Sequence, residues 1–154
     1  MSALEPHLLW QQLGLPNKPR KWPRALHADL VSKLSQRGAT AIAFDIIFEE
    51  TREPDDNRQF ADAMREAGNV VLFQYLKKDA IAISSRNGQR QREAQVETLV
   101  SPIPELKQAA FGLAPFPLPK VPAQVNHFLL FKTELGHVPT WPMAALQVYA
   151  LPVY

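Results

Sequence analysis

The stretch AIAFDIIF, residues 41–48, consists of apolar residues around one carboxylate, Asp45. Apolar residues on both faces are typical of an interior strand that is covered by helices on each side, because successive side chains of a strand point to opposite faces of the sheet. An ionised carboxylate that is buried without a partner destabilises a fold strongly. We therefore predict an interior strand over 41–48 and a specific partner for Asp45.

The segments around this strand predict an α/β fold. Leu26, Leu30 and Leu34 recur at every fourth position after Pro23, with Val31 beside them, which predicts an amphipathic helix that buries them and ends at Gly38. Residues 53–68 predict a second helix, and residues 69–76 a second strand. The order helix, strand, helix, strand with short links predicts a largely parallel sheet with helices on both faces.

The second helix has its own internal pattern. Phe60, Met64 and Ala67 form the stripe that should be buried, Asp55 or Asp56 is the candidate N-cap, and Gly68 is the expected terminator.

The rest of the chain predicts shorter elements. Residues 77–100 are polar and contain Asn87-Gly88, a strong signal for a tight turn, and they predict a solvated β-hairpin that projects from the sheet. The further expectations are a short helix within 101–112 that ends at Gly112, no regular structure in the proline-rich segment 113–122, a third strand over 125–132, and a final helix over 139–150. That helix has Thr140 as its candidate cap and Pro142 in its first turn. It is apolar nearly all round, so its outer side should contact another surface.

Composition limits the possible functions. The chain has 154 residues, a net charge of +2 and no cysteine. One core suffices for this length, the balanced charge gives no reason to expect a nucleic-acid partner, and thiol chemistry is excluded. The sequence has no phosphate-binding loop, nucleophile elbow or zinc motif, and we expect no cofactor. No apolar stretch approaches the ~20 residues of a membrane helix, so the chain as given is expected to be soluble.

Carboxylates gather where the first strand ends. Ligands of parallel sheets bind beyond the carboxyl ends of the strands, and this stretch of sequence holds Asp45, Glu49, Glu50, Asp55 and Asp56. Oxygen ligands of this kind could hold a divalent cation. The alternative is an ordinary solvated loop followed by a helix cap.

Two groups could neutralise Asp45. Both the guanidinium of Arg24 and the indole N–H of Trp22 belong to the start of the helix that precedes the strand. That helix runs antiparallel to the strand, so its start returns to the carboxyl end of the strand. We predict an ion pair between Arg24 and Asp45, in which charge-assisted hydrogen bonds offset the cost of desolvation.

These residues resemble a known family. Residues 22–48 combine Trp22-Pro23-Arg24, Gly38-Ala39 and Phe44-Asp45 with Phe48, and in this combination the chain is similar to the second type of CHASE domain. The closing stretch GHVPTWPMAALQVYAL, residues 136–151, resembles the last helix of that family. The resemblance covers roughly residues 20–151. Where many relatives carry an aspartate-glycine-arginine segment, this chain has PLPKVPAQVNHFLLF, and no ligand is inferred from the family.

The resemblance implies an extracytoplasmic, periplasmic sensor domain of a membrane-anchored bacterial adenylate cyclase, diguanylate cyclase, histidine kinase or serine/threonine kinase. Residues 1–21 are then an extended lead-in, 22–151 a single non-catalytic sensor domain, and 152–154 a tail that leads towards a membrane span. The implied partners are an unidentified small-molecule or protein stimulus and a second copy in a homodimer.

Two hypotheses from other classes stay open. One is a small carboxylate- or metal-dependent enzyme that uses Asp45 with Glu49 and with Asp55 or Asp56. The other is a ligand-free assembly module in which Asp45 only stabilises the fold.

Overall fold

The computed structural model describes residues 22–83, 92–117, 129–133 and 136–151. The predicted lead-in 1–21, the Asn87-Gly88 turn, the larger part of the predicted strand 125–132 and the tail 152–154 lie outside the described residues. The elements are α2 (Arg24–Gln36), β1 (Ile42–Phe44), α3 (Pro54–Ala67), β2 (Val70–Ile83), β3 (Arg92–Val100), α4 (Pro104–Ala109), β4 (Gly112–Pro115), β5 (Phe131–Lys132), β6 (Val138–Pro139) and α5 (Trp141–Ala150).

The main sheet is mixed. Its longest strand, β2, pairs in parallel with β1 and β4 through its first half, and antiparallel with β3 through its second half. The prediction of a largely parallel sheet is therefore wrong in that detail, although the α/β class is confirmed. The sequence pattern placed the end of β2 at residue 76, but the strand runs on to Ile83 and becomes one side of the hairpin.

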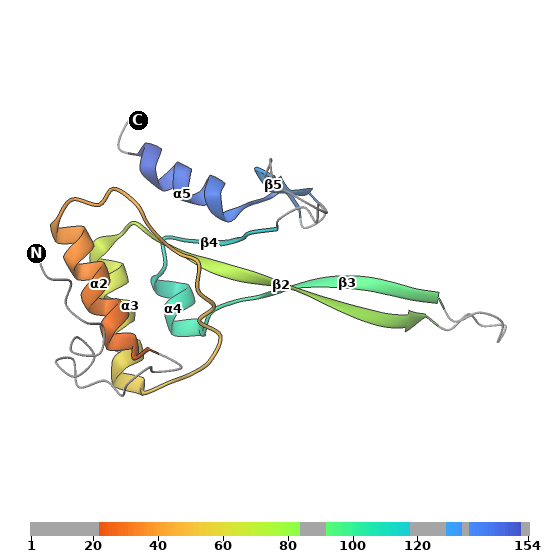
Figure 1. The fold of residues 1–154 in the computed structure, drawn as a ribbon, viewed down its shortest axis with the longest axis horizontal. Helices are drawn as coiled ribbons and strands as arrows, with labels where there is room; N and C mark the ends of the chain where they lie inside the picture. Colours follow the sequence, from red (N-terminus) through yellow and green to blue (C-terminus); the bar gives the residue numbers. More distant parts are fainter. Residues whose placement is uncertain (1–21, 84–91, 118–128, 134–135, 152–154) are drawn as a thin grey trace, which may run out of the picture.

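Helices cover both faces of the sheet, as predicted (Figure 1). Val70 and Leu72 point to one face, where they pack in a core with residues of α2, α3 and α4. Val71 lies between them in sequence and points to the other face, where it packs against Ala144 and Val148 of α5. The alternation of a strand thus sets up two separate cores.

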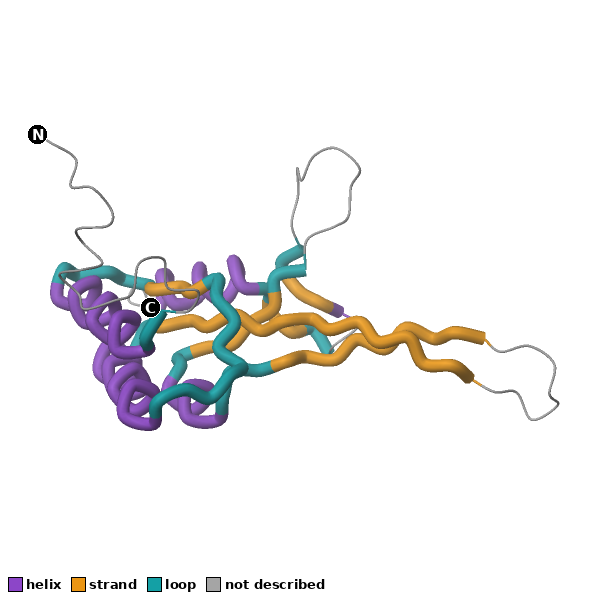
Figure 2. Tube along the Cα trace, turned by 60° about the horizontal axis from the view of Figure 1, so that its bottom comes forward, coloured by secondary structure: helices purple, strands orange, loops and turns teal. Residues whose placement is uncertain are grey.

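The predicted hairpin projects far from this layered body (Figures 1 and 2). Its register runs from Tyr75 opposite Val100 to Ile83 opposite Arg92. The hairpin is a long two-stranded ribbon, which we call the arm (residues 75–83 and 92–100).

The first helix buries the predicted face only in part: Val31 is buried and Leu34 packs against the core, but Leu30 is exposed. Leu30 is 45% exposed, whereas Arg24, His27, Ala28 and Val31 are buried. Apolar spacing could not rank an arginine and a histidine as core residues, because their burial depends on contacts from a distant loop. The helix end is as predicted: Gly38 has a φ of 79°, in the left-handed region that glycine adopts easily.

Three predicted boundaries differ from the structure. The strand expected over 41–48 ends at Phe44, and residues 45–53 form a loop. Gly112 does not end a helix but begins β4, which continues into the proline-rich segment where no regular structure was expected. Among the described residues β4 pairs with β2 alone, and an edge position of this kind tolerates Pro115, because a missing N–H donor costs little there. Within the described residues, the predicted third strand contributes only β5, which pairs with β6 in a separate small sheet.

Candidate functional site

A buried guanidinium lies where the start of α2 meets the loop 45–53. Arg24 is 1% exposed, its Nη2 donates a hydrogen bond to the carbonyl oxygen of Glu50 at 3.2 Å, and its Cζ lies 4.3 Å from the ring centroid of Phe48. Burial, and next the positive charge of Arg52, lower the pKa of Arg24 to about 10, while the charge of Glu50 acts in the opposite direction. The group stays protonated at neutral pH and binds the loop through a carbonyl and an aromatic face.

Four rings meet beside this guanidinium, each from a different part of the chain. His27 comes from α2, Phe44 from β1, Phe48 from the loop and Phe60 from α3, and their ring centroids lie 5.3 to 6.0 Å apart. Tilted and edge-on pairs at such distances are favourable beyond the burial of their area. The cluster makes Phe48 a core residue, although Phe48 lies in a loop.

His27 is the polar member of the cluster, and the apolar spacing gave no signal for it. It is 7% exposed, and its Nδ1 donates to the carbonyl oxygen of Pro23 at 3.0 Å. Burial lowers the pKa of His27 below its usual 6.5, the Pro23 carbonyl acts against this, and the charges of Arg24 and Arg52 lower it further. At neutral pH the imidazole is therefore uncharged.

The predicted ion pair between Arg24 and Asp45 is wrong. Because β1 ends at Phe44, Asp45 is the first residue of the loop and its side chain is exposed to solvent. Within the described part of the chain, no hydrogen bond or ion pair reaches the Asp45 carboxylate, and Arg24 contacts Glu50 and Phe48 instead. Trp22, the other suggested partner, is 44% exposed, and its carbonyl oxygen accepts a hydrogen bond from Arg52.

The other acidic candidates lie apart from this centre. Glu49 is exposed in the loop, and the N-cap of α3 is Glu53, so the prediction of Asp55 or Asp56 as N-cap is wrong. Pro54 occupies the first turn, and the two aspartates follow it there, where their charge is favourable to the helix dipole. Across the ranges that the structure describes, no three histidine, aspartate or glutamate side chains gather closely enough to hold a metal ion. The described residues therefore give no support to the metal-dependent alternative.

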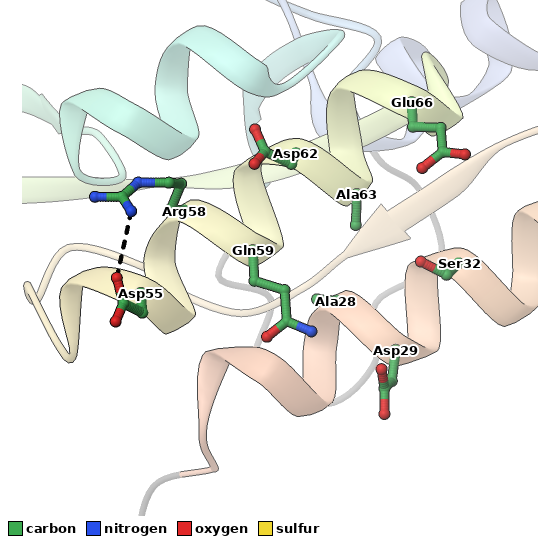
Figure 3. A pocket seen from close by; sticks show the side chains of 9 residues that line it. All are labelled: Ala28, Asp29, Ser32, Asp55, Arg58, Gln59, Asp62, Ala63 and Glu66. Atoms are coloured by element: carbon green, nitrogen blue, oxygen red, sulfur yellow. Dashed lines mark hydrogen bonds and ion pairs between the residues drawn. The ribbon is translucent and has the colours of Figure 1, made fainter.

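A groove of about 410 Å³ lies between α2 and α3 (Figure 3). Its lining comes from both helices: Ala28, Asp29, Ser32, Asp55, Arg58, Gln59, Asp62, Ala63 and Glu66. Of the site residues predicted from the sequence, only Asp55 is among them. The polar sides of two amphipathic helices look like ordinary solvated faces until the fold sets them side by side.

The charges in the groove are unequal. Four carboxylates and one guanidinium line it, and that guanidinium, Arg58, lies 3.3 Å from Asp55. Asp62 is bound by Arg65 at 2.6 Å, whereas Gln59 points across the gap towards α2 (Figure 3). This lining suits a small polar molecule that is neutral or cationic, since hydroxyl, amide and carboxylate oxygens accept hydrogen bonds from its donors.

The outer side of α5 is apolar. Leu146 is 54% exposed, Tyr149 60% and Leu151, which follows the helix, 53%. Thr140 is the N-cap residue and Pro142 lies in the first turn, as predicted, but the Thr140 hydroxyl donates to the carbonyl of Leu129 at 2.6 Å instead of capping the helix. None of the described helices is both long and apolar enough to cross a membrane.

Comparison with protein families shows that residues 8–150 match the model of the CHASE2 domain. No curated protein and no solved structure matches the chain.

Proposed function

Because the chain belongs to the CHASE2 family, a family of extracellular sensory domains, we propose that it is the non-catalytic signal-input domain of a membrane-anchored bacterial signalling protein with a cyclase or kinase output. The family match over residues 8–150 carries this proposal. The domain spans residues 22–151, lies outside the cytoplasm in the periplasm, and works as a homodimer.

The fold supports an output through α5. This helix is the last described element, it packs on the face of the sheet opposite to α2, α3 and α4, and its exposed surface is apolar (Figure 1). A tail at 152–154 that continues towards a membrane span would make α5 the element that transmits a change in the domain. A stimulus acts in this way only if it binds two arrangements of the domain with different affinity.

The groove between α2 and α3 is the candidate binding site for a small-molecule stimulus. A ligand there would contact α2 and α3 together, and α2 also carries Arg24, which binds the loop after β1. Asp45 and Glu49, which are exposed in the loop after β1, are further candidates for contact with a ligand or a protein.

The placement outside the cytoplasm can be tested in the intact protein. Fusions of alkaline phosphatase, which is active only outside the cytoplasm, and of β-galactosidase, which is active only inside, are made after residue 151 of the full-length gene product. We expect activity from the phosphatase fusion alone. Activity from the β-galactosidase fusion alone would contradict the proposed function.

Ligand binding can be tested by thermal shift with amino acids, sugars, polyamines and small peptides. A ligand present at about 100 times its dissociation constant stabilises the folded state by about 2.7 kcal/mol, which raises the melting temperature measurably. Gln59→Trp fills the groove and should abolish the shift, whereas Leu30→Gln on the outer side of α2 should preserve it. A shift that survives Gln59→Trp would place the ligand elsewhere.

A further inference from the structure

The arm exposes several large apolar side chains to solvent. Tyr75 is 44% exposed, Ile81 49% and Val96 40%. Tyr75 and Ile81 are separated by an even number of positions in β2, and Val96 lies opposite Asp79, which belongs to the same alternation. All three side chains therefore lie on one face of the arm.

The arm also has unpaired backbone. In the described ranges no strand pairs with the outer edge of β3, since its register is with β2 alone. A two-stranded ribbon in water is marginally stable, and an open edge offers a row of N–H and C=O groups to another strand. Three or more strands with one apolar face are the usual stable arrangement.

We propose that the arm is the dimerisation element: β3 pairs antiparallel with β3 of a second copy of this chain, which makes a four-stranded sheet across a two-fold axis. This inference rests on the proposed function for the homodimer and adds the surface that forms it.

The register follows from symmetry. Val96 is the middle residue of the nine-residue strand β3, so an axis through Val96 pairs every residue of the strand. This register sets Gln95 opposite Glu97 and Ala94 opposite Thr98 of the second copy, and it brings the two Val96 side chains together on the apolar face. A shift that centres the axis on Glu97 instead sets two carboxylates opposite each other, which is destabilising.

The charges of the arm are compatible with a second copy. On the face that carries Tyr75, Ile81 and Val96, the side chains of Lys77 and Asp79 form an ion pair at 3.1 Å. On the other face, Lys78 lies 2.8 Å from Glu97, so the carboxylate that would meet Gln95 already has a counter-charge. At these positions an identical arm therefore meets no excess of like charge.

The arm is joined to the output helix. Lys132 of β5 lies 3.2 Å from Glu97, and the backbone N–H of Thr140 donates to the carbonyl of Leu130 at 2.9 Å. Thr140 is the N-cap residue of α5. Pairing of two arms would thus fix the base of each arm against the segment from which α5 begins.

Cysteine cross-linking tests the register directly, because the chain has no cysteine of its own. Directly opposite residues of antiparallel strands have Cα atoms about 4.5 to 5.5 Å apart, within the range that a disulfide spans. Under mild oxidation we expect Val96→Cys to form a covalent dimer, and Asp62→Cys, which places a cysteine on an exposed position of α3, to remain uncrosslinked. Equal rates of cross-linking for the two variants would overturn the proposal.

Sedimentation of the 154-residue chain over a range of concentrations gives an independent test. Val96→Lys places two ammonium groups at the axis, and we expect it to weaken dimerisation by about tenfold or more. Leu30→Lys makes the same kind of change on α2 and should leave the dimer intact. A chain that is monomeric at every concentration, or a Val96→Lys variant that dimerises like the parent, would refute dimerisation through the arm. Neither result would bear on the extracytoplasmic placement, which the fusion experiment tests separately.

Discussion

The guanidinium of Arg24 lies over the ring of Phe48, with Cζ 4.3 Å from the ring centroid. Both side chains are buried, and they come from the first residue of α2 and from the middle of the loop after β1. A desolvated cation over an aromatic face is attracted by the ring quadrupole, and the hydrogen bond to the Glu50 carbonyl adds a second link to the same loop. Arg24 thus joins the loop to the helix through an aromatic ring and a backbone carbonyl, and the charge of Glu50 also favours the protonated guanidinium.

Removing this arginine should destabilise the fold to a degree that depends on what replaces it. Arg24→Ala leaves a cavity and removes both links to the loop, so we expect the free energy of unfolding to fall by about 2–4 kcal/mol. Arg24→Met keeps most of the volume and removes a desolvated charge, so we expect a loss below about 1.5 kcal/mol. Urea unfolding of both variants measures this order. Equal losses would show that packing volume plays no part.

Asp45 should be dispensable for stability. Its side chain is exposed and receives no hydrogen bond or ion pair within the described part of the chain, so Asp45→Ala should change the free energy of unfolding by less than about 0.5 kcal/mol. If urea unfolding showed that Asp45→Ala lowers the free energy of unfolding by several kcal/mol, the result would support the predicted ion pair with Arg24 instead. If Asp45 contacts a ligand, the same variant should lose the thermal shift that this ligand causes.

Acid should destabilise the protein through His27. The pKa of His27 is below 6.5 in the folded state, because of burial first of all. The unfolded chain therefore binds the proton more readily, and the stabilisation is complete above about pH 6.5 and decreases as the pH falls towards the folded pKa. We expect the free energy of unfolding to fall as the pH is lowered below about 6.5, and His27→Gln to flatten this dependence. An unchanged slope in the variant would assign the effect to another group.

The start of α5 depends on one hydroxyl. Thr140 is fully buried, and its Oγ1 donates to the Leu129 carbonyl and also lies 3.2 Å from the Leu130 carbonyl. Thr140→Val preserves the shape and leaves these carbonyls without that donor, so we expect a loss of about 1–2 kcal/mol. Thermal unfolding measures the change, and Thr98→Val on the arm is the matched control with a smaller expected effect.

Local patterns predicted those elements whose stability is local. The spacing of Phe60 and Met64 with the terminator Gly68 gave α3, and Asn87-Gly88 predicted the hairpin although the turn lies outside the described residues. The strand after Phe44 was extended too far because Ile46 and Ile47 continue the apolar run, yet both are more than 40% exposed. Only Phe48 turns inwards.

The candidate site was less accessible to sequence reasoning, because its contacts are non-local. Arg24 was a candidate from the sequence as a partner of Asp45, but its hydrogen bond goes to a backbone carbonyl and its guanidinium lies over a ring, and neither contact leaves a charge pattern in the sequence. The burial of His27 depends on three phenylalanines from three other segments. The groove between α2 and α3 arises only when two solvated faces become neighbours.

A double-mutant cycle between Arg24 and Phe48 tests the role of the buried guanidinium most directly. Arg24→Met, Phe48→Leu and the double variant are unfolded in urea, and the coupling free energy is taken from the four values. We expect a coupling of about 1–2 kcal/mol in favour of the native pair, as is typical of a desolvated cation over a ring. A coupling of zero within error between Arg24 and Phe48, together with a strong coupling between Arg24 and Asp45 in the corresponding cycle, would contradict the claim that the guanidinium stabilises the fold through the ring of Phe48.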